Sequence, residues 1–298
     1  MRVVLTGGTG YVGTALGREL ARRGHQVRLL VHNRGRFVPG RDESFDIVYG
    51  SVLDTNACLR ACEACDAVVH LVGIIREFPA RGITFDALHT EATRILVRSA
   101  EQQRAGRFIH MSALGARENA TSNYHRTKYA AEEIVRRSSL DWTIFRPSII
   151  FDRGSEFISM LVDMVQRSVV PLIGGGGSKL QPVSRGDVAR CMAASLSIPE
   201  TRGRIYELGG ADQLPLREML SAIASHLGRA PKMVSIPAAF MKPVVRLMER
   251  FPAFPLTSDQ LTMLLEDNVC DTADAVRMFG IEPESFVAEL PLLLDHEV

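Results

Sequence analysis

The first thirteen residues constrain the fold more than any other stretch of this chain. The apolar, β-branched segment 2–6 predicts a buried strand. Gly7, Gly10 and Gly13 follow, and the apolar residues after them recur with the spacing of a helix face. A strand, a glycine turn and a helix in this order direct backbone N–H groups and the positive end of a helix dipole toward an anion. The stretch therefore predicts a turn that binds the pyrophosphate of a dinucleotide.

Strand and helix patterns continue to alternate along the chain, which predicts an α/β fold with a doubly wound parallel (Rossmann) sheet. We expect further strands at 26–32, 46–49, 66–71, 108–111 and 143–145, and the apolar stripe over 84–103 predicts a helix there. The pattern changes after residue 150. We therefore expect a dinucleotide-binding domain over 1–150, to which 184–208 returns, and a smaller C-terminal substrate lobe built from 151–183 and 209–298.

Charge, apolar runs and cysteine spacing argue against several classes of function. A net charge of +1 and the lack of a Lys/Arg run with interleaved aromatic residues give no sign of a nucleic-acid partner. No apolar run is long enough to cross a bilayer, and the first strand begins at residue 2, so we expect no signal peptide and a cytoplasmic protein. Cys58, Cys62 and Cys65 lie close together, but no fourth ligand has zinc-like spacing, and we expect packing cysteines and no metal site.

The end of the second strand indicates which nicotinamide cofactor is bound. NAD-binding domains place an acidic residue there to accept hydrogen bonds from the ribose hydroxyls. This chain has Val31 and His32 at that point, followed by Asn33 and Arg34. We therefore expect NADP (NADPH) in preference to NAD. The alternative is that the arginines of this segment belong to a solvated loop without a ligand.

The segment Tyr124-His-Arg-Thr-Lys128 is the candidate for the chemistry. It opens a predicted helix, so Tyr124 and Lys128 lie one turn apart on the same face. A free phenol titrates near pH 10, and a neighbouring ammonium would lower that pKa toward neutrality. The pair therefore predicts an acid/base dyad, and the lysine could also bind the nicotinamide ribose. The alternative is a solvent-facing Tyr/Lys pair.

Several longer stretches resemble one known group of proteins. They are 108–116, 124–128, 141–151, 181–188 and 206–210, together with the G-x-x-G-x-x-G spacing of the first turn. They resemble an atypical, extended branch of the short-chain dehydrogenase/reductase superfamily. This branch contains the nucleotide-binding accessory subunit of respiratory complex I and bacterial relatives labelled nucleoside-diphosphate-sugar epimerases. The resemblance covers nearly the whole chain.

The resemblance implies a set of cofactor contacts along the carboxyl edge of the sheet, with Ser51 at the position where related enzymes often hold the adenine through an aspartate. The implied contacts are Gly7, Thr9, Gly10, Tyr11, Val12, Gly13, His32, Asn33, Arg34, Ser51, Val52, Leu71, Val72, Gly73, Met111, Tyr124, Lys128, Pro147 and Ile150.

The chain departs from the superfamily around the dyad. Ser112 is the candidate for the hydroxyl that polarises the substrate oxygen, although the usual alignment puts Ala113 at that position. His89 stands where an asparagine is common, Asp152 where a glycine is common and Ser184 where a histidine is common. The Tyr124–Lys128 dyad is therefore intact. The other two positions of the superfamily's usual four-residue active site, the hydroxyl residue and the asparagine, differ in this chain.

Two classes of function remain open. The first is an NAD(P)H-dependent oxidoreductase or epimerase/dehydratase-like enzyme acting on a small or lipid-soluble carbonyl or quinone. The second is a non-catalytic NADPH-binding protein with a structural, assembly or redox-sensing role at a membrane respiratory complex. The segment 239–251 bears on this choice, because its wide apolar stripe and basic residues indicate either packing onto the second lobe or a peripheral contact with a membrane or a respiratory complex at the inner face of the membrane.

Overall fold

The computed structural model describes residues 1–33, 45–251 and 254–294, which form two compact units. The first unit comprises Met1–Pro147, Arg185–Glu207 and Thr272–Ile281. The second comprises Ser148–Ser184, Leu208–Asp271 and the residues from Glu282 onward. The chain therefore passes repeatedly between the units, and each unit is assembled from separated segments.

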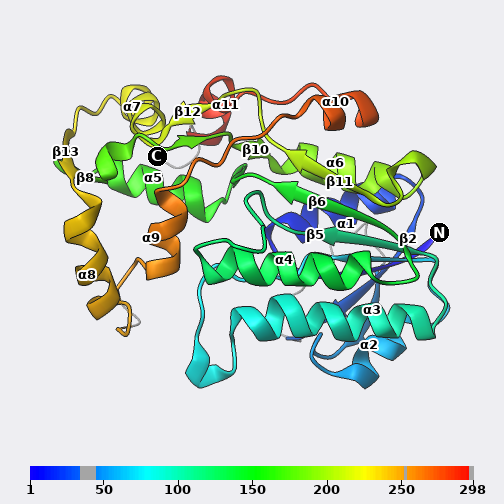
Figure 1. The fold of residues 1–298 in the computed structure, drawn as a ribbon. Coiled ribbons are helices and arrows are strands. Elements are labelled where there is room, and N and C mark those ends of the chain that lie inside the picture. The colour runs from blue at the N-terminus through cyan, green and yellow to red at the C-terminus, as the bar shows by residue number, and fades with distance from the viewer. Residues whose placement is uncertain (34–44, 252–253, 295–298) are drawn as a thin grey trace. The chain divides into compact units, whose positions relative to one another are not determined.

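A seven-stranded sheet forms the centre of the first unit (Figure 1). Its strands are β1 (Arg2–Thr6), β2 (Gln26–Val31), β3 (Asp46–Tyr49), β4 (Ala67–His70), β5 (Arg107–Met111), β6 (Asp141–Pro147) and β11 (Arg204–Leu208). They are arranged in the order β11-β6-β5-β4-β1-β2-β3, and the neighbours from β3 to β6 run parallel. The order reverses between β1 and β4, where such sheets bind ligands. The predicted doubly wound Rossmann architecture is confirmed.

Helices cover both faces of this sheet (Figure 1). On one side α1 (Tyr11–Arg22) packs against α6 (Arg185–Ser195), and on the other α3 (Ala92–Gln102) packs between α2 (Thr55–Cys62) and α4 (Asn123–Arg136). The core on the second side includes Val4, Val68 and Phe108, which are fully buried on adjacent strands. Cys58, Cys62 and Cys65 are buried beside this core, and burial raises the pKa of the Cys58 and Cys62 thiols to about 12.

The helix expected over 84–103 is not uniform. Residues Asp86–Glu91 form a π-helical segment, η2, before α3 continues as a regular α-helix. A π-turn inserts extra chain without interrupting the helix, and such turns are frequent at functional sites. Here the turn carries His89, whose side chain is 1% exposed. Apolar periodicity could not reveal it, because the residues on both sides keep the same buried stripe.

Arg107 connects the segment Arg185–Glu207, which returns to the first unit, to the sheet of that unit. Its guanidinium is 4% exposed and donates hydrogen bonds to two backbone carbonyls and two threonine hydroxyls. The acceptors are Asp141 O (2.7 Å), Thr143 Oγ1 (2.6 Å), Ser195 O (2.9 Å) and Thr201 Oγ1 (2.8 Å). Burial lowers the pKa of Arg107 to about 10, so the guanidinium stays charged at neutral pH and needs these acceptors.

The second unit has its own core between α5 (Glu156–Val165), α7 (Leu216–His226) and α11 (Phe286–Leu294). Short paired strands complete it: β7 (Ile150–Phe151) with β10 (Val183–Ser184), β8 (Val169–Ile173) with β13 (Lys232–Ile236), and β9 (Lys179–Leu180) with β12 (Leu214–Pro215). The unit also contains the helices α8 (Ala238–Met248) and α9 (Ser258–Leu264). No helix within the described ranges is both long enough and apolar enough to span a bilayer.

The helix α10 (Ala273–Phe279) belongs to the first unit, whereas its sequence position had suggested the smaller lobe. Its last residue, Phe279, packs against Tyr206 with ring centroids 4.9 Å apart and against Phe145 at 5.6 Å. These aromatic contacts connect the helix to β11 and β6 and explain its assignment.

Candidate active site on the first unit

The glycine turn between β1 and α1 is built from close backbone approaches. Gly7 has a φ of +75°, and a side chain there would lie 3.2 Å from Leu71 Cβ. A Cβ on Gly13 would lie 2.1 Å from the Gly7 carbonyl oxygen, so only glycine lets the helix start this near the strand. Gly10 is the N-cap and supplies no side-chain cap, and no acidic residue lies in the first turn of α1. Gly10 N–H donates to Gly7 O at 2.9 Å within the turn, and the N–H groups at the start of α1 are the ones that would bind a diphosphate.

The loop after β4 runs past the glycine turn. Leu71 N–H donates to Thr6 O at 3.2 Å, and Val72 N lies 3.3 Å from the position a Cβ on Gly7 would occupy. Gly73 lies near the dyad, since a Cβ on it would be 3.7 Å from Lys128 Nζ and 3.5 Å from His89 Nε2. The structure thus brings the predicted segments 7–13 and 71–73 together with Lys128.

The adenosine end of the predicted site is described only in part. His32 and Asn33 are exposed directly after β2, while Arg34 lies outside the described residues. Ser51 Oγ accepts a hydrogen bond from Leu53 N–H at 3.1 Å, and Val52 is 9% exposed. No carboxylate stands at the last residues of β2, Leu30 and Val31, or at His32 and Asn33.

The dyad residues lie in the first turns of α4. Ser122 caps this helix by accepting a hydrogen bond from His125 N–H at 3.2 Å, which fixes the start of the helix just before Tyr124. Lys128 is 3% exposed and its ammonium donates to Met111 O at 2.6 Å, at the carboxyl end of β5. The Tyr124 ring is half-buried and packs edge-on against Phe85 and His89, with centroids 5.8 and 5.4 Å away. The alternative of a solvent-facing pair does not fit this burial.

The electrostatics differ from the sequence expectation. Burial raises the pKa of Tyr124 to about 12, whereas a lowered pKa was expected from the neighbouring lysine. That expectation was wrong because loss of solvent around the phenol outweighs the ammonium, which is hydrogen-bonded to Met111 O. Burial also lowers the pKa of Lys128 to about 8, against the opposing effect of the Glu132 carboxylate one turn further along α4.

Glu132 is itself fully buried and held by a two-pronged ion pair. Arg146 donates to it through Nε at 2.9 Å and through a terminal nitrogen at 2.8 Å. The same guanidinium lies 3.4 Å from Glu207. Arg146 therefore holds the Glu132 carboxylate in place one helical turn from Lys128.

His89 connects the loop after β4 to the dyad helix. His89 Nδ1 lies 2.9 Å from Thr127 Oγ1 on α4, and His89 Nε2 lies 3.1 Å from Ile74 N and 3.2 Å from Ile74 O. Burial lowers the pKa of His89 to about 2, so the ring is neutral. At the position where an asparagine is common, this chain has a neutral histidine that joins two segments and contacts the Tyr124 ring.

A buried polar row lies next to Lys128, and sequence reasoning missed it. The sheet register aligns Thr6, His70 and His110 on adjacent strands, two residues beyond the apolar row of Val4, Val68 and Phe108. The imidazoles stack with centroids 5.5 Å apart, and His70 Nδ1 lies 2.7 Å from Thr6 Oγ1. Among the described residues, neither ring nitrogen of His110 nor His70 Nε2 has a hydrogen-bond partner. Burial and the Lys128 charge lower the pKa of His70 to about 3, and that of His110 also falls.

The remaining predicted residues follow β5 and β6. Ser112 is 4% exposed, its N–H donates to Phe145 O at 2.7 Å, and its hydroxyl finds no partner within the described part of the chain. Ala113 is also buried and offers no hydroxyl. Pro147 ends β6 in the first unit and accepts a hydrogen bond from Leu114 N–H. Ile150 lies in the second unit, where β7 pairs with Val183.

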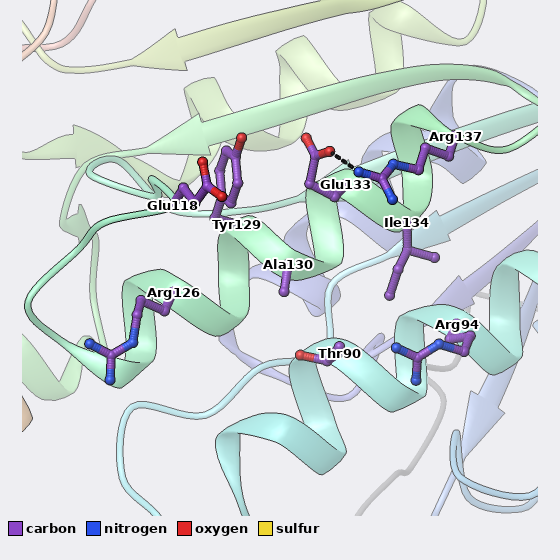
Figure 2. A pocket seen from close by; sticks show the side chains of 9 residues that line it. All are labelled: Thr90, Arg94, Glu118, Arg126, Tyr129, Ala130, Glu133, Ile134 and Arg137. Carbon is purple, nitrogen blue, oxygen red and sulfur yellow. Dashed lines mark hydrogen bonds and ion pairs between the residues drawn. The ribbon is translucent and has the colours of Figure 1, made fainter.

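A separate hollow of about 390 Å³ lies on the outer surface of the first unit, over η2, α3 and α4 (Figure 2). Its lining residues are Thr90, Arg94, Glu118, Arg126, Tyr129, Ala130, Glu133, Ile134 and Arg137. Figure 2 shows the ion pair between two of these lining residues, Glu133 and Arg137, whose charged atoms are 3.1 Å apart. Neither dyad residue lines this hollow, so it does not hold the predicted chemistry.

In the described part of the chain, no group of three or more His, Cys, Asp or Glu residues has an arrangement that could hold a metal ion. The three neighbouring cysteines instead contribute to the core beside α2.

Comparison with known proteins gives related sequences over most of the chain. A family model described as NAD(P)H-binding matches residues 7–199. The mitochondrial NADH dehydrogenase [ubiquinone] 1 alpha subcomplex subunit 9 of Arabidopsis thaliana is 30% identical over 280 residues, covering 89% of this chain and 68% of that protein. A ceramide reductase from Caulobacter vibrioides is 28% identical over 237 residues, covering 79% of this chain and 73% of that protein.

Solved structures agree on the fold. A nucleoside-diphosphate-sugar epimerase from Staphylococcus aureus has a TM-score of 0.80 at 18% identity, with 97% of this chain and 99% of that chain covered. A UDP-glucose 4-epimerase from Thermotoga maritima has a TM-score of 0.76 at 18% identity, with 100% and 98% covered. At these identities the likeness establishes the fold alone. Together with the sequence matches, it shows that the chain belongs to the NAD(P)H-binding family of Rossmann proteins, in the atypical branch of the short-chain dehydrogenase/reductases that includes the complex I accessory subunit.

Proposed function

We propose that this protein is an NADP(H)-dependent oxidoreductase or epimerase/dehydratase-like enzyme in which Tyr124 and Lys128 form the acid/base dyad. The observation that carries the proposal is the buried Lys128, whose ammonium bonds to Met111 O one helical turn from Tyr124. Burying an ammonium costs free energy, and buried ionisable groups of this kind cluster at functional sites. This one lies beside the loop that passes the glycine turn.

Each part of the site would have a distinct task. The N–H groups after Gly7 and Gly10 would bind the diphosphate, and Lys128 would donate to the nicotinamide ribose. The bound nicotinamide supplies or accepts the hydride. The Tyr124 phenol, with its pKa raised to about 12, holds its proton at neutral pH and is therefore in the state that donates a proton to a carbonyl oxygen during reduction.

The preference for NADP rests on the end of β2. An acidic residue there would repel a 2′-phosphate, and the described residues Val31, His32 and Asn33 carry none. The substrate class we propose is a small or lipid-soluble carbonyl or quinone. The names of two relatives, a ceramide reductase and a subunit of an NADH–ubiquinone oxidoreductase, are in keeping with such substrates.

The test is NADPH oxidation with a panel of carbonyl compounds and quinones, comparing wild type with Tyr124→Phe. Removing the phenol proton should lower kcat about 10²–10⁴-fold, the range expected for loss of a general acid. NADPH affinity should remain, because the phenol is not needed to bind the diphosphate. Equal rates in the two proteins would rule out Tyr124 as the acid. Retention of activity with NADH alone would rule out the proposed cofactor preference.

The departures around the dyad favour a second candidate function. Ala113 offers no hydroxyl, and His89 is committed to Ile74 and Thr127. A protein with this site could hold NADPH without turnover and act in assembly or redox sensing at a respiratory complex, peripheral at the inner face of the membrane. That candidate predicts co-purifying NADPH, a nucleotide-dependent rise in melting temperature and no oxidation with any member of the panel.

A further inference from the structure

The helix α8 directs large apolar side chains into solvent. Phe240, Val244 and Leu247 are 71%, 46% and 56% exposed, and Phe251, just beyond the end of the helix, is 47% exposed. Only Val245 is fully buried in this helix. The helix lies beside α9 in the second unit (Figure 1). Packing onto the lobe therefore accounts for part of its apolar residues and leaves the bulkiest ones uncovered.

The exposed residues form a continuous stripe. Positions 240, 244 and 247 are spaced by four and three residues, which places them on one side of α8, and Phe251 follows in the turn after the helix. A helix in a globular protein normally turns such a stripe toward the core. Isolated apolar residues on a surface need no explanation, but a contiguous patch indicates an interaction site.

The exposed charged residues of this segment have one sign. Lys242, Arg246 and Arg250 are all exposed and recur every four residues. The helix contains no acidic residue, and the carboxylate of Glu249, just after it, accepts a hydrogen bond from Ser258 N–H at 2.7 Å. Arg250 also lies over the Phe251 ring, 5.0 Å from its centroid. Since the whole chain carries a net charge of only +1, this positive row is a local feature.

We propose that α8 is a docking helix that lies flat on an anionic membrane surface. The apolar stripe would enter the boundary between headgroups and acyl chains, and the long side chains of the basic row would extend to the lipid phosphates. The charge row favours a membrane over a protein partner, because every described charged side chain of the helix is positive and a lipid surface requires no matched geometry. This docking goes beyond the proposed reaction and stands whether or not the dyad is active.

The experiment is flotation of the full chain with vesicles of phosphatidylcholine alone or with roughly a third phosphatidylglycerol. Wild type should float with the anionic vesicles, and added salt should weaken the binding. Phe240→Asp combined with Leu247→Asp should lower the bound fraction at least tenfold. Arg246→Gln and Arg250→Gln should each lower binding to anionic vesicles about fivefold.

Met160→Asp is the matched control, because Met160 is 46% exposed on α5 in the same unit and lies outside the stripe. It should float like wild type. Circular dichroism and the unfolding midpoint of each variant separate lost docking from lost folding. Failure of wild type to float overturns the proposal and assigns the stripe to a protein partner. An equal loss in Met160→Asp also overturns it, since binding would then not depend on α8.

Discussion

The two halves of the candidate site are built by different means. The glycine turn is made of backbone: Gly7, Gly10 and Gly13 leave room for close approaches, and no side chain of these residues takes part. The dyad half is made of side chains that hold one another, with Lys128 between Met111 O, Glu132 and a row of neutral histidines. The glycine turn is therefore sensitive to any added side-chain atom. The stability and chemistry of the dyad half depend instead on which charged groups are buried together.

The largest expected effect tests the backbone half. In Gly13→Ala the new Cβ would overlap the Gly7 carbonyl oxygen, so the first strand and helix must move apart at a cost of about 3 kcal/mol or more. We expect loss of nucleotide binding and a much lower unfolding midpoint, measured by calorimetry and by NADPH titration. Gly17→Ala on the same helix is the control, because its Cβ would meet Leu5 at an ordinary 3.6 Å. An equal loss in both variants would mean that helix α1, and not the turn, is sensitive.

The second prediction tests the charge in the dyad half. The pKa of Lys128 is about 8 in the folded chain against 10.5 when exposed, so the unfolded state binds more protons between these values. Stability then rises with pH from about 8 to 10.5, by about 3 kcal/mol in total, as the buried ammonium loses its proton. Lys128→Met should abolish this rise, as measured by urea unfolding across that range, and should not lower stability at pH 7.

The exposed residue Lys179 provides the control for this measurement. Lys179→Met should keep the wild-type dependence on pH. If Lys128→Met keeps it as well, the ammonium of Lys128 is not the buried charge that the site depends on, and the contrast between the two halves is lost.

The smallest effect concerns the histidine row. His70 and His110 have lowered pKa values in the folded chain, so the unfolded state binds their protons first as the pH falls below 6.5. Protonation of His70 should cost about 2 kcal/mol of stability between pH 6.5 and 5, and protonation of His110 should add a loss of the same sign. His110→Leu should remove one share of this acid sensitivity in urea unfolding, while His226→Gln, at an exposed position, should not. An unchanged acid profile in His110→Leu would mean that the row is solvated.

The sequence predicted the backbone half in detail because its determinants are local. Three glycines at fixed spacing between a strand and a helix predict the strand, close turn and helix that the structure has at residues 2–22. The doubly wound sheet followed from the alternation of patterns, and the position of the dyad at the start of a helix followed from the spacing of Tyr124 and Lys128.

The side-chain half could not be predicted to the same extent. The row Thr6–His70–His110 exists only because three strands far apart in sequence pair in register. The bridge through His89 depends on a π-turn that leaves no trace in apolar periodicity. The sign of the Tyr124 pKa shift depended on burial, which a motif does not report. One signal was present: polar residues at the ends of otherwise apolar strands are unusual and deserve a functional reading.

Arg107 has a consequence for how this protein can be divided. Its acceptors come from the neighbouring strand and from residues 195–201, so the guanidinium is satisfied only after the chain has left the first unit and returned. A fragment ending at Pro147 would contain the whole glycine turn and the dyad yet leave a buried cation short of acceptors. Residues 1–147 therefore do not form a separable nucleotide-binding domain. Domain swaps or truncations must retain the segment Arg185–Glu207.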